Sequence, residues 1–121
     1  MRRPILILAA LLPLAAQAHH PGSHANRRAD GQVMVEVVAT ASDSCIRIAS
    51  VRLGTPATVA PPPGSTPVTA RLVREGGACA TVVKALREEV ALPVPASARQ
   101  ILLYVEGADG SVESTERVPI R

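Results

Sequence analysis

The chain has 121 residues, of which 47% are hydrophobic, and it carries 13 Lys and Arg against 10 Asp and Glu. This length fits one domain with a tail and leaves too few residues for a second independent core. Phe and Trp are absent, and Tyr104 is the only aromatic residue. Binders of single-stranded nucleic acid need rings on which bases stack, and sites for sugars or quaternary ammonium groups use aromatic faces. The composition therefore argues against these functions.

The first 18 residues have the features of a secretory signal peptide. Arg2 and Arg3 form a positively charged start, residues 5–14 are mostly apolar, and Ala16-Gln17-Ala18 matches the A-x-A pattern of a cleavage site. The apolar stretch is shorter than the roughly 20 residues that span a bilayer, and polar sequence follows it. We therefore expect export, to the periplasm or to the exterior, with no membrane span after cleavage.

Removal of the signal peptide changes the charge balance. Without Arg2 and Arg3, 11 basic and 10 acidic residues remain, so the net charge falls from +3 to about +1. A charge this small does not indicate nucleic acid or an anionic membrane as a partner.

Two parts are expected in the exported chain. Residues 19–31 are polar, rich in turn formers and without hydrophobic periodicity, which predicts a flexible N-terminal arm. In residues 32–121 apolar and polar residues alternate with a period of two, in segments that are separated by Gly and Pro. No helical periodicity is sustained, so we predict a single β domain. The expected strands are residues 33–40, 45–53, 68–74, 79–86, 90–94, 100–106 and 111–120. A bulge is expected near Ser50, and the strands 68–74 and 79–86 are expected to form a hairpin with its turn at 75–78.

Two connections have distinctive sequences. Residues 54–67 contain Pro61-Pro62-Pro63, which favours an extended conformation and excludes pairing inside a sheet. We interpret this segment as a stiff crossover loop between two sheets, with a docking segment for a proline-recognising partner as the alternative. Asp109-Gly110 is a typical hairpin turn and predicts that the last two strands are antiparallel neighbours.

The number and spacing of these segments predict the fold class. About seven short strands separated by turn signals are typical of an all-β fold, a small antiparallel β-sandwich. Residues 90–120 resemble the closing strands of immunoglobulin-like and fibronectin-type modules, with Tyr104 where their tyrosine corner falls. The resemblance implies an immunoglobulin-like or fibronectin-like sandwich. The Trp that antibody domains carry between their two cysteines is missing here.

Cys45 and Cys79 are the only cysteines. In an oxidising compartment an even pair is most simply a disulfide. A loop of about 34 residues would stabilise the fold by roughly 3–4 kcal/mol in the chain-entropy model, which suits a core of Val, Ala, Ile and Leu. A metal site and a redox pair are the alternatives, but no C-x-x-C spacing supports either.

The histidines are the one chemical anomaly. All three, His19, His20 and His24, fall within the first six residues after the expected cleavage site. Imidazole is the commonest protein ligand of Cu(II), Ni(II) and Zn(II), and a terminal His19 adds an α-amino group that a metal can deprotonate. We therefore predict a transition-metal site at His19, His20 and His24, with copper as the favoured ion. The alternative is a solvated tail whose histidines are incidental.

This terminus resembles that of the copper-binding histidine-brace proteins, exported β-sandwiches that begin with a metal-binding His. The resemblance implies a second His from the folded domain, but none follows His24, so a carboxylate or the arm would have to take its place. Cleavage after Ala16 would instead put His19 third, the pattern of amino-terminal Cu(II)- and Ni(II)-binding sequences. Met34 is a candidate soft ligand, although a lone Met is usually a packing residue.

An enzyme is not expected. No His lies in residues 32–121 to act as a positioned base, and the chain has no G-x-S-x-G, H-E-x-x-H or Gly-rich nucleotide loop. The remaining alternative is a non-catalytic interaction or structural module of the cell envelope. Such a module would bind a protein partner through an exposed sheet edge or through Pro61–Pro63.

Overall fold

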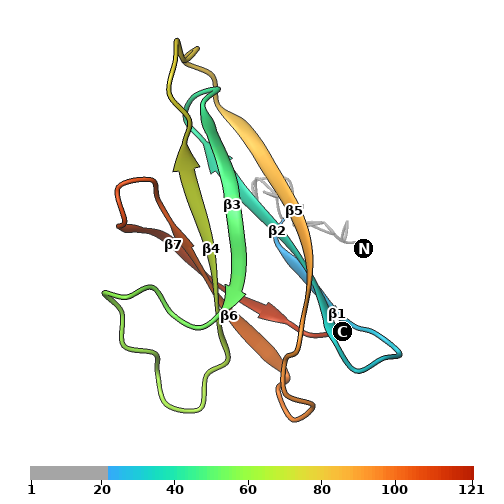
Figure 1. Ribbon diagram of the computed structural model, residues 1–121. Helices are drawn as coiled ribbons and strands as arrows, with labels where there is room; N and C mark the ends of the chain where they lie inside the picture. The colour runs from blue at the N-terminus through green and yellow to red at the C-terminus, as the bar shows by residue number, and fades with distance from the viewer. Residues whose placement is uncertain (1–21) are drawn as a thin grey trace, which may run out of the picture.

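The computed structural model describes residues 22–121 (Figure 1). The expected signal peptide, His19 and His20 lie outside the described residues. Within them the chain is all-β, without a helix that could cross a bilayer. Seven strands form two packed sheets, a three-stranded β1-β2-β5 and a four-stranded β3-β4-β6-β7, consistent with a small β-sandwich. The strands are β1 (His24–Arg27), β2 (Val33–Ala41), β3 (Ile46–Leu53), β4 (Pro67–Arg74), β5 (Lys84–Leu92), β6 (Gln100–Glu106) and β7 (Val112–Pro119).

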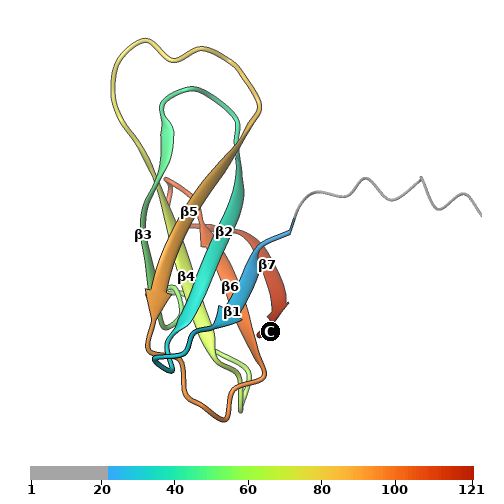
Figure 2. The ribbon, with the colours of Figure 1, turned by 90° about the vertical axis from the view of Figure 1, so that its right-hand side faces the viewer.

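The two sheets face each other (Figure 2), and buried aliphatic side chains form the core between them. Val33, Val35 and Val37 of β2 are fully buried, and the residues between them face outward, as the period-2 alternation requires. In β6 every side chain from Ile101 to Val105 is buried, on both faces of the strand. The main core cluster comprises Ala25, Val33, Val35, Val37, Val68, Ala70, Leu92, Val94, Ile101, Leu103 and Val118.

The strand order differs from that of the immunoglobulin fold. In that fold the third strand pairs with the sixth. Here β4 lies between β3 and β6, and β4 runs parallel to β6, with Val68 opposite Leu103. All other paired strands are antiparallel, as the sequence predicts. The immunoglobulin and fibronectin resemblance therefore remains one of sequence pattern.

The prediction that residues 68–74 and 79–86 form a hairpin is wrong. β4 pairs with β3 and β6, whereas β5 belongs to the other sheet and pairs with β2 along its whole length. Residues 75–83 are consequently a crossover between the sheets, and β5 starts at Lys84. The charged residues 87–89, which separate the predicted strands 79–86 and 90–94, lie inside β5. An edge strand tolerates such charges because solvent reaches it.

The prediction of a flexible arm over residues 19–31 is wrong for His24–Arg27, which form β1. β1 pairs with β2, and its other edge meets the C-terminus, where the N–H of Arg27 donates to the Arg121 carbonyl at 2.8 Å and the Arg121 N–H donates to the Ala25 carbonyl at 3.0 Å. Arg27 also donates from its guanidinium to the carbonyls of Gly31, Val94, Pro95 and Ala98. The folded domain thus includes His24.

Three local predictions can be compared with the structure. The register of β3 against β4 shifts between Ile48 and Ser50, which confirms the bulge. β6 and β7 form the hairpin expected around Asp109-Gly110. The proline segment, in contrast, is not a crossover between sheets, because β3 and β4 are antiparallel neighbours and residues 54–66 are their long hairpin loop.

Candidate functional site

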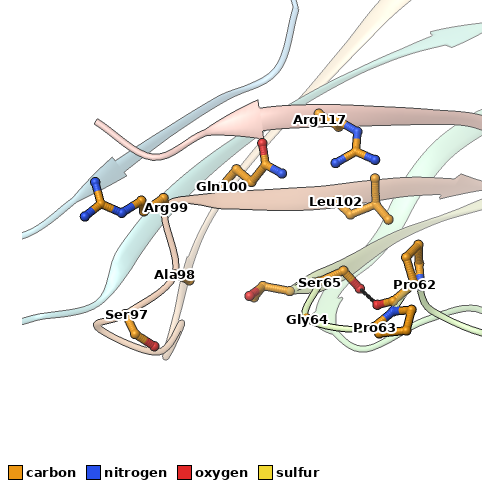
Figure 3. Close-up of a pocket in the computed structure, with 11 residues that line it drawn as sticks. Pro62, Pro63, Gly64, Ser65, Ser97, Ala98, Arg99, Gln100, Leu102 and Arg117 are labelled. Carbon is orange, nitrogen blue, oxygen red and sulfur yellow. Dashed lines mark hydrogen bonds between the residues drawn. The ribbon is translucent and has the colours of Figure 1, made fainter.

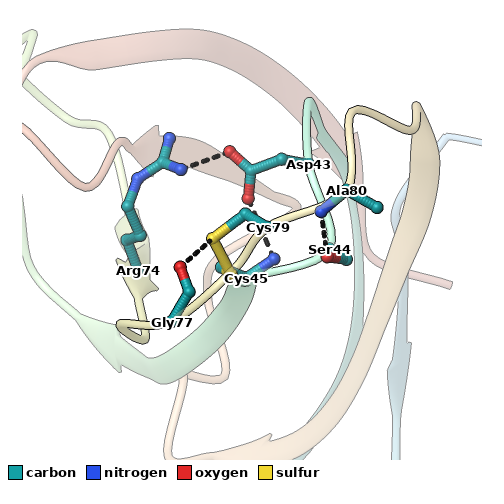
Figure 4. Close-up of a disulfide and its surroundings, with 7 residues drawn as sticks. All are labelled: Asp43, Ser44, Cys45, Arg74, Gly77, Cys79 and Ala80. Atoms are coloured by element: carbon teal, nitrogen blue, oxygen red, sulfur yellow. Dashed lines mark hydrogen bonds and ion pairs between the residues drawn. A yellow bond between two sulfur atoms is a disulfide. The ribbon is translucent and has the colours of Figure 1, made fainter.

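One end of the sandwich is closed by the predicted disulfide (Figure 4). Cys45 and Cys79 are bonded, with their Cα atoms 5.4 Å apart. Cys45 precedes β3 of one sheet and Cys79 lies in the crossover that leads to β5 of the other. The bond therefore ties the two sheets together. It is compatible with an oxidising, exported location, and it uses both thiols, so neither can act as a metal ligand.

Polar contacts surround the disulfide. One carboxylate oxygen of Asp43 accepts the backbone N–H of Cys45 at 2.9 Å, and the other pairs with the Arg74 guanidinium. The N–H of Cys45, followed by the charge of Arg74, lowers the pKa of Asp43. Ser44 bonds Ala80 from the crossover in both directions, through its backbone N–H and its hydroxyl. These contacts hold the chain around the bond.

In residues 22–121 one group of three or more His, Cys, Asp or Glu residues has donor atoms that all lie within 4.8 Å of one another. It consists of Asp43, Cys45 and Cys79. The two sulfurs are bonded to each other and cannot act as thiolate ligands. We therefore interpret the group as structural and not as a metal site.

The outer face of the three-stranded sheet carries a different set of donors. His24 of β1 is directly opposite Glu36 of β2, and Glu36 is directly opposite Glu89 of β5. Directly paired residues in an antiparallel sheet share a face, with Cβ atoms about 4.5–5.5 Å apart. One imidazole and two carboxylates therefore form a row across three strands, and we call it the His24–Glu36–Glu89 row.

The row is not assembled for a metal in this structure. Its donor atoms do not meet within 4.8 Å. Glu36 is held by Arg87, whose guanidinium nitrogen lies 2.9 Å from a carboxylate oxygen. Glu89 faces a like charge in Glu36, an arrangement that is unfavourable unless a cation lies between or beside them. Arg87 supplies that cation here, and a metal ion would have to take its place.

Sequence reasoning found His24 but missed both carboxylates. The alternation of β2 does place Glu36 on the outward face, together with Met34. Met34 lies opposite Asn26, which is the next residue after His24 on the same face of β1. Met34 and His24 are therefore diagonal neighbours, and the Cα atoms of such neighbours lie about 7–8 Å apart. What no local pattern could show is that β1 exists and that β2 pairs with β5.

Comparisons with protein-family models, with curated proteins and with solved structures found no match for this chain.

Proposed function

We propose that the protein is an exported β-sandwich of the periplasm that binds a transition-metal ion, copper by preference, through its N-terminal histidines. The observation that carries the proposal is the pairing of His24 with Glu36, and of Glu36 with Glu89, on one face of the sheet. This pairing offers carboxylate donors beside the histidine-bearing start of the chain. The role of the protein would be to buffer or deliver the ion.

The ligand set follows from the chemistry of these groups. Cleavage after Ala18 gives His19 a free α-amino group, and its amine and imidazole chelate one ion. His19 and His20 precede His24 by five and four positions in the sequence, and the proposal gives the imidazoles of all three to one ion. In the histidine-brace resemblance the second His comes from the folded domain, and the proposal gives this role to His24, which is the first residue of β1. Mixed nitrogen and oxygen ligands bind Cu(II) most tightly among the divalent first-row ions.

A Cu(II) titration of the exported protein tests the proposal. Mass spectrometry first fixes the mature N-terminus. Affinity is then measured by competition with a chelator for the wild type, for His24→Ala and for His19→Ala/His20→Ala. We expect each variant to bind roughly tenfold more weakly or worse. Asn26→Ala is the matched control, because Asn26 is an exposed residue on the same face of β1. Unchanged affinity in the histidine variants would contradict the proposal.

A second candidate function is supported by the crossover before β5. Val82 and Val83 are 42% and 80% exposed, and they continue into an edge strand of the three-stranded sheet. An extended segment of another envelope protein could pair with residues 82–83 through main-chain hydrogen bonds, ahead of the part of β5 that Glu88 protects from pairing. Val83→Asp should abolish such pairing without changing copper affinity. A partner that still binds Val83→Asp would remove this candidate.

A further inference from the structure

A cavity of about 580 Å³ lies on the outer face of the four-stranded sheet (Figure 3). The proline loop and the turn before β6 form its two sides, and the first residues of β6 form its floor. Its volume falls within the range of about 300–1,000 Å³ that is typical of small-ligand sites. It is remote in the fold from the His24–Glu36–Glu89 row, which lies on the other sheet.

The charged residues that line this cavity are all basic. Arg99 and Arg117 contribute guanidinium groups, and no Asp or Glu is among the lining residues. In residues 22–121 the salt bridges engage other arginines, so these two charges are not neutralised by a carboxylate. The cavity therefore carries an uncompensated positive potential.

Strand alternation explains why no acid balances Arg117. Its neighbour Glu116 points to the opposite face of β7, where its carboxylate accepts the backbone N–H of Ser23 at 3.2 Å. Arg117 is paired with Leu102 of β6, and Figure 3 shows its guanidinium beside Leu102 and the Gln100 amide. A planar fork of N–H groups and an amide thus face the same space.

Arg99 acts from a greater distance. In Figure 3 its side chain extends away from Leu102. It also lines a neighbouring cavity together with Arg27 and Arg121. The positive potential therefore extends beyond the cavity itself, along this end of the sandwich, where it would steer an anion toward Arg117.

The apolar side of the cavity is preformed. Pro62 and Pro63 have fixed φ angles, and Ser65 closes the loop by donating from its backbone N–H and its hydroxyl to the Pro62 carbonyl, at 3.2 and 2.7 Å. Ala98 and Leu102 add apolar surface. The combination suits a ligand with an anionic head and a short aliphatic part.

We propose that this cavity is an oxyanion-binding site, which takes the carboxylate or phosphate group of a small ligand. Arg117 binds the oxyanion through its guanidinium fork, Gln100 donates an amide hydrogen bond, and Pro62 and Pro63 contact the aliphatic part. The site is independent of the proposed metal function, because no residue is shared between the two.

Backbone NMR titrations with three probes test the site. The probes are inorganic phosphate, N-acetyl-trialanine with a free carboxylate, and the C-terminal amide of the same peptide. We expect saturable shifts of the backbone amides of residues 64–66 and 98–102 with phosphate or with the free peptide, and none with the peptide amide. Saturation by phosphate alone identifies a phosphate ligand, and saturation by the free peptide alone identifies a carboxylate ligand. The proposal would be overturned if neither probe saturated the protein below about 10 mM, a dissociation constant that corresponds to a binding free energy of about 3 kcal/mol.

Substitution separates specific binding from general attraction. Arg117→Gln should weaken binding of the active probe about tenfold. Arg71→Gln removes an equal charge from the same sheet, where Arg71 pairs with Glu106, and should leave the affinity unchanged. Arg117 is exposed, so its variant should keep the wild-type melting temperature. Equal losses in the two variants would show a nonspecific charge effect and would overturn the site.

Discussion

The hydroxyl of Ser23 accepts a hydrogen bond from the backbone N–H of Val38 at 3.0 Å. This contact continues the pairing of β1 with β2 by one position, with a side chain in place of a carbonyl. The backbone N–H of Ser23 in turn bonds the carboxylate of Glu116 in β7. The residue before His24 is thus bonded to both sheets, which gives the imidazole a defined starting point on the domain surface.

Ser23→Ala should destabilise the protein by about 1–3 kcal/mol, because the part-buried N–H of Val38 loses its acceptor. Urea unfolding measures the change. Ser97→Ala, an exposed serine with no comparable contact to a strand, should change the free energy of unfolding by less than about 0.5 kcal/mol. A Ser23→Ala protein as stable as the Ser97→Ala control would show that this hydrogen bond does not hold β1 in place.

Replacing both cysteines by alanine should cost about 3–4 kcal/mol of unfolding free energy. The disulfide closes a loop with a sequence separation of 34, and its loss restores entropy to the unfolded chain. The loss should be measured by denaturant unfolding of the double variant, with the reduced wild type as the matched comparison. A cost below about 1 kcal/mol would mean that the contacts of Asp43 and Ser44 hold the sheets together without the bond.

The stability of the protein should fall in acid, in part through Asp43. The N–H of Cys45, followed by Arg74, depresses the pKa of this carboxyl in the folded state below its ordinary value of 3.8. The carboxylate therefore contributes stability above about pH 4, and this contribution is lost as the pH falls through the folded-state pKa.

Asp43→Asn should reduce the decline in stability between pH 4 and the acid limit and should lower stability near pH 7. The measurement is thermal unfolding across this pH range, with Asp30→Asn as the control. A residual acid dependence is expected from Asp109, whose pKa is lowered by hydrogen bonds from the Ser111 hydroxyl and backbone. Identical pH profiles for Asp43→Asn and wild type would contradict this account.

Arg87→Ala should increase the affinity for Cu(II), because it releases Glu36 from the guanidinium at 2.9 Å and leaves Glu36 and Glu89 with no cation. Competition titration measures the change. Arg47→Ala removes another exposed ion pair, with Glu75, and should have no effect. Lower affinity in the Arg87→Ala protein would argue against Glu36 as a ligand.

Glu88→Val should promote self-association. Glu88 is paired with the buried Val37, so it points to the inner face of β5, yet it is exposed at the sheet edge. An inward-pointing charge on an edge strand hinders pairing with another chain. Light scattering over time should show growth for Glu88→Val and none for Glu88→Gln. A Glu88→Val protein that stays monomeric would place the protection against association elsewhere.

Much of the fold could be read from local pattern. Val33, Val35 and Val37 alternate with residues that face outward, and this signal needs no knowledge of their partners. The bulge near Ser50 and the turn at Asp109-Gly110 could be predicted for the same reason, because each depends on a few adjacent residues. The pairing of Cys45 with Cys79 needed only an even count and an oxidising compartment.

The errors all concern contacts between distant segments. Residues 24–27 have no apolar periodicity, and β1 forms because β2 and the C-terminus offer hydrogen bonds to its backbone. Turn chemistry at residues 75–78 shows that the chain bends but not whether it returns to the same sheet or crosses to the other. Glu36 and Glu89 likewise lie opposite each other only through pairing across 53 positions, as the register of β2 against β5 shows.

The sequence by itself determined the composition of the protein: an aliphatic core almost without aromatic residues, one cysteine pair and three histidines gathered near the start. These are properties of residue types and short-range order, so they do not depend on how the strands pair. Only the tertiary structure decided that His24 belongs to the folded domain, that Glu36 lies opposite it with Glu89 one strand further, and that Arg117 lines a cavity without an acid. Strand register is set by burial and hydrogen bonding over the whole sheet, and no short segment of the chain encodes it.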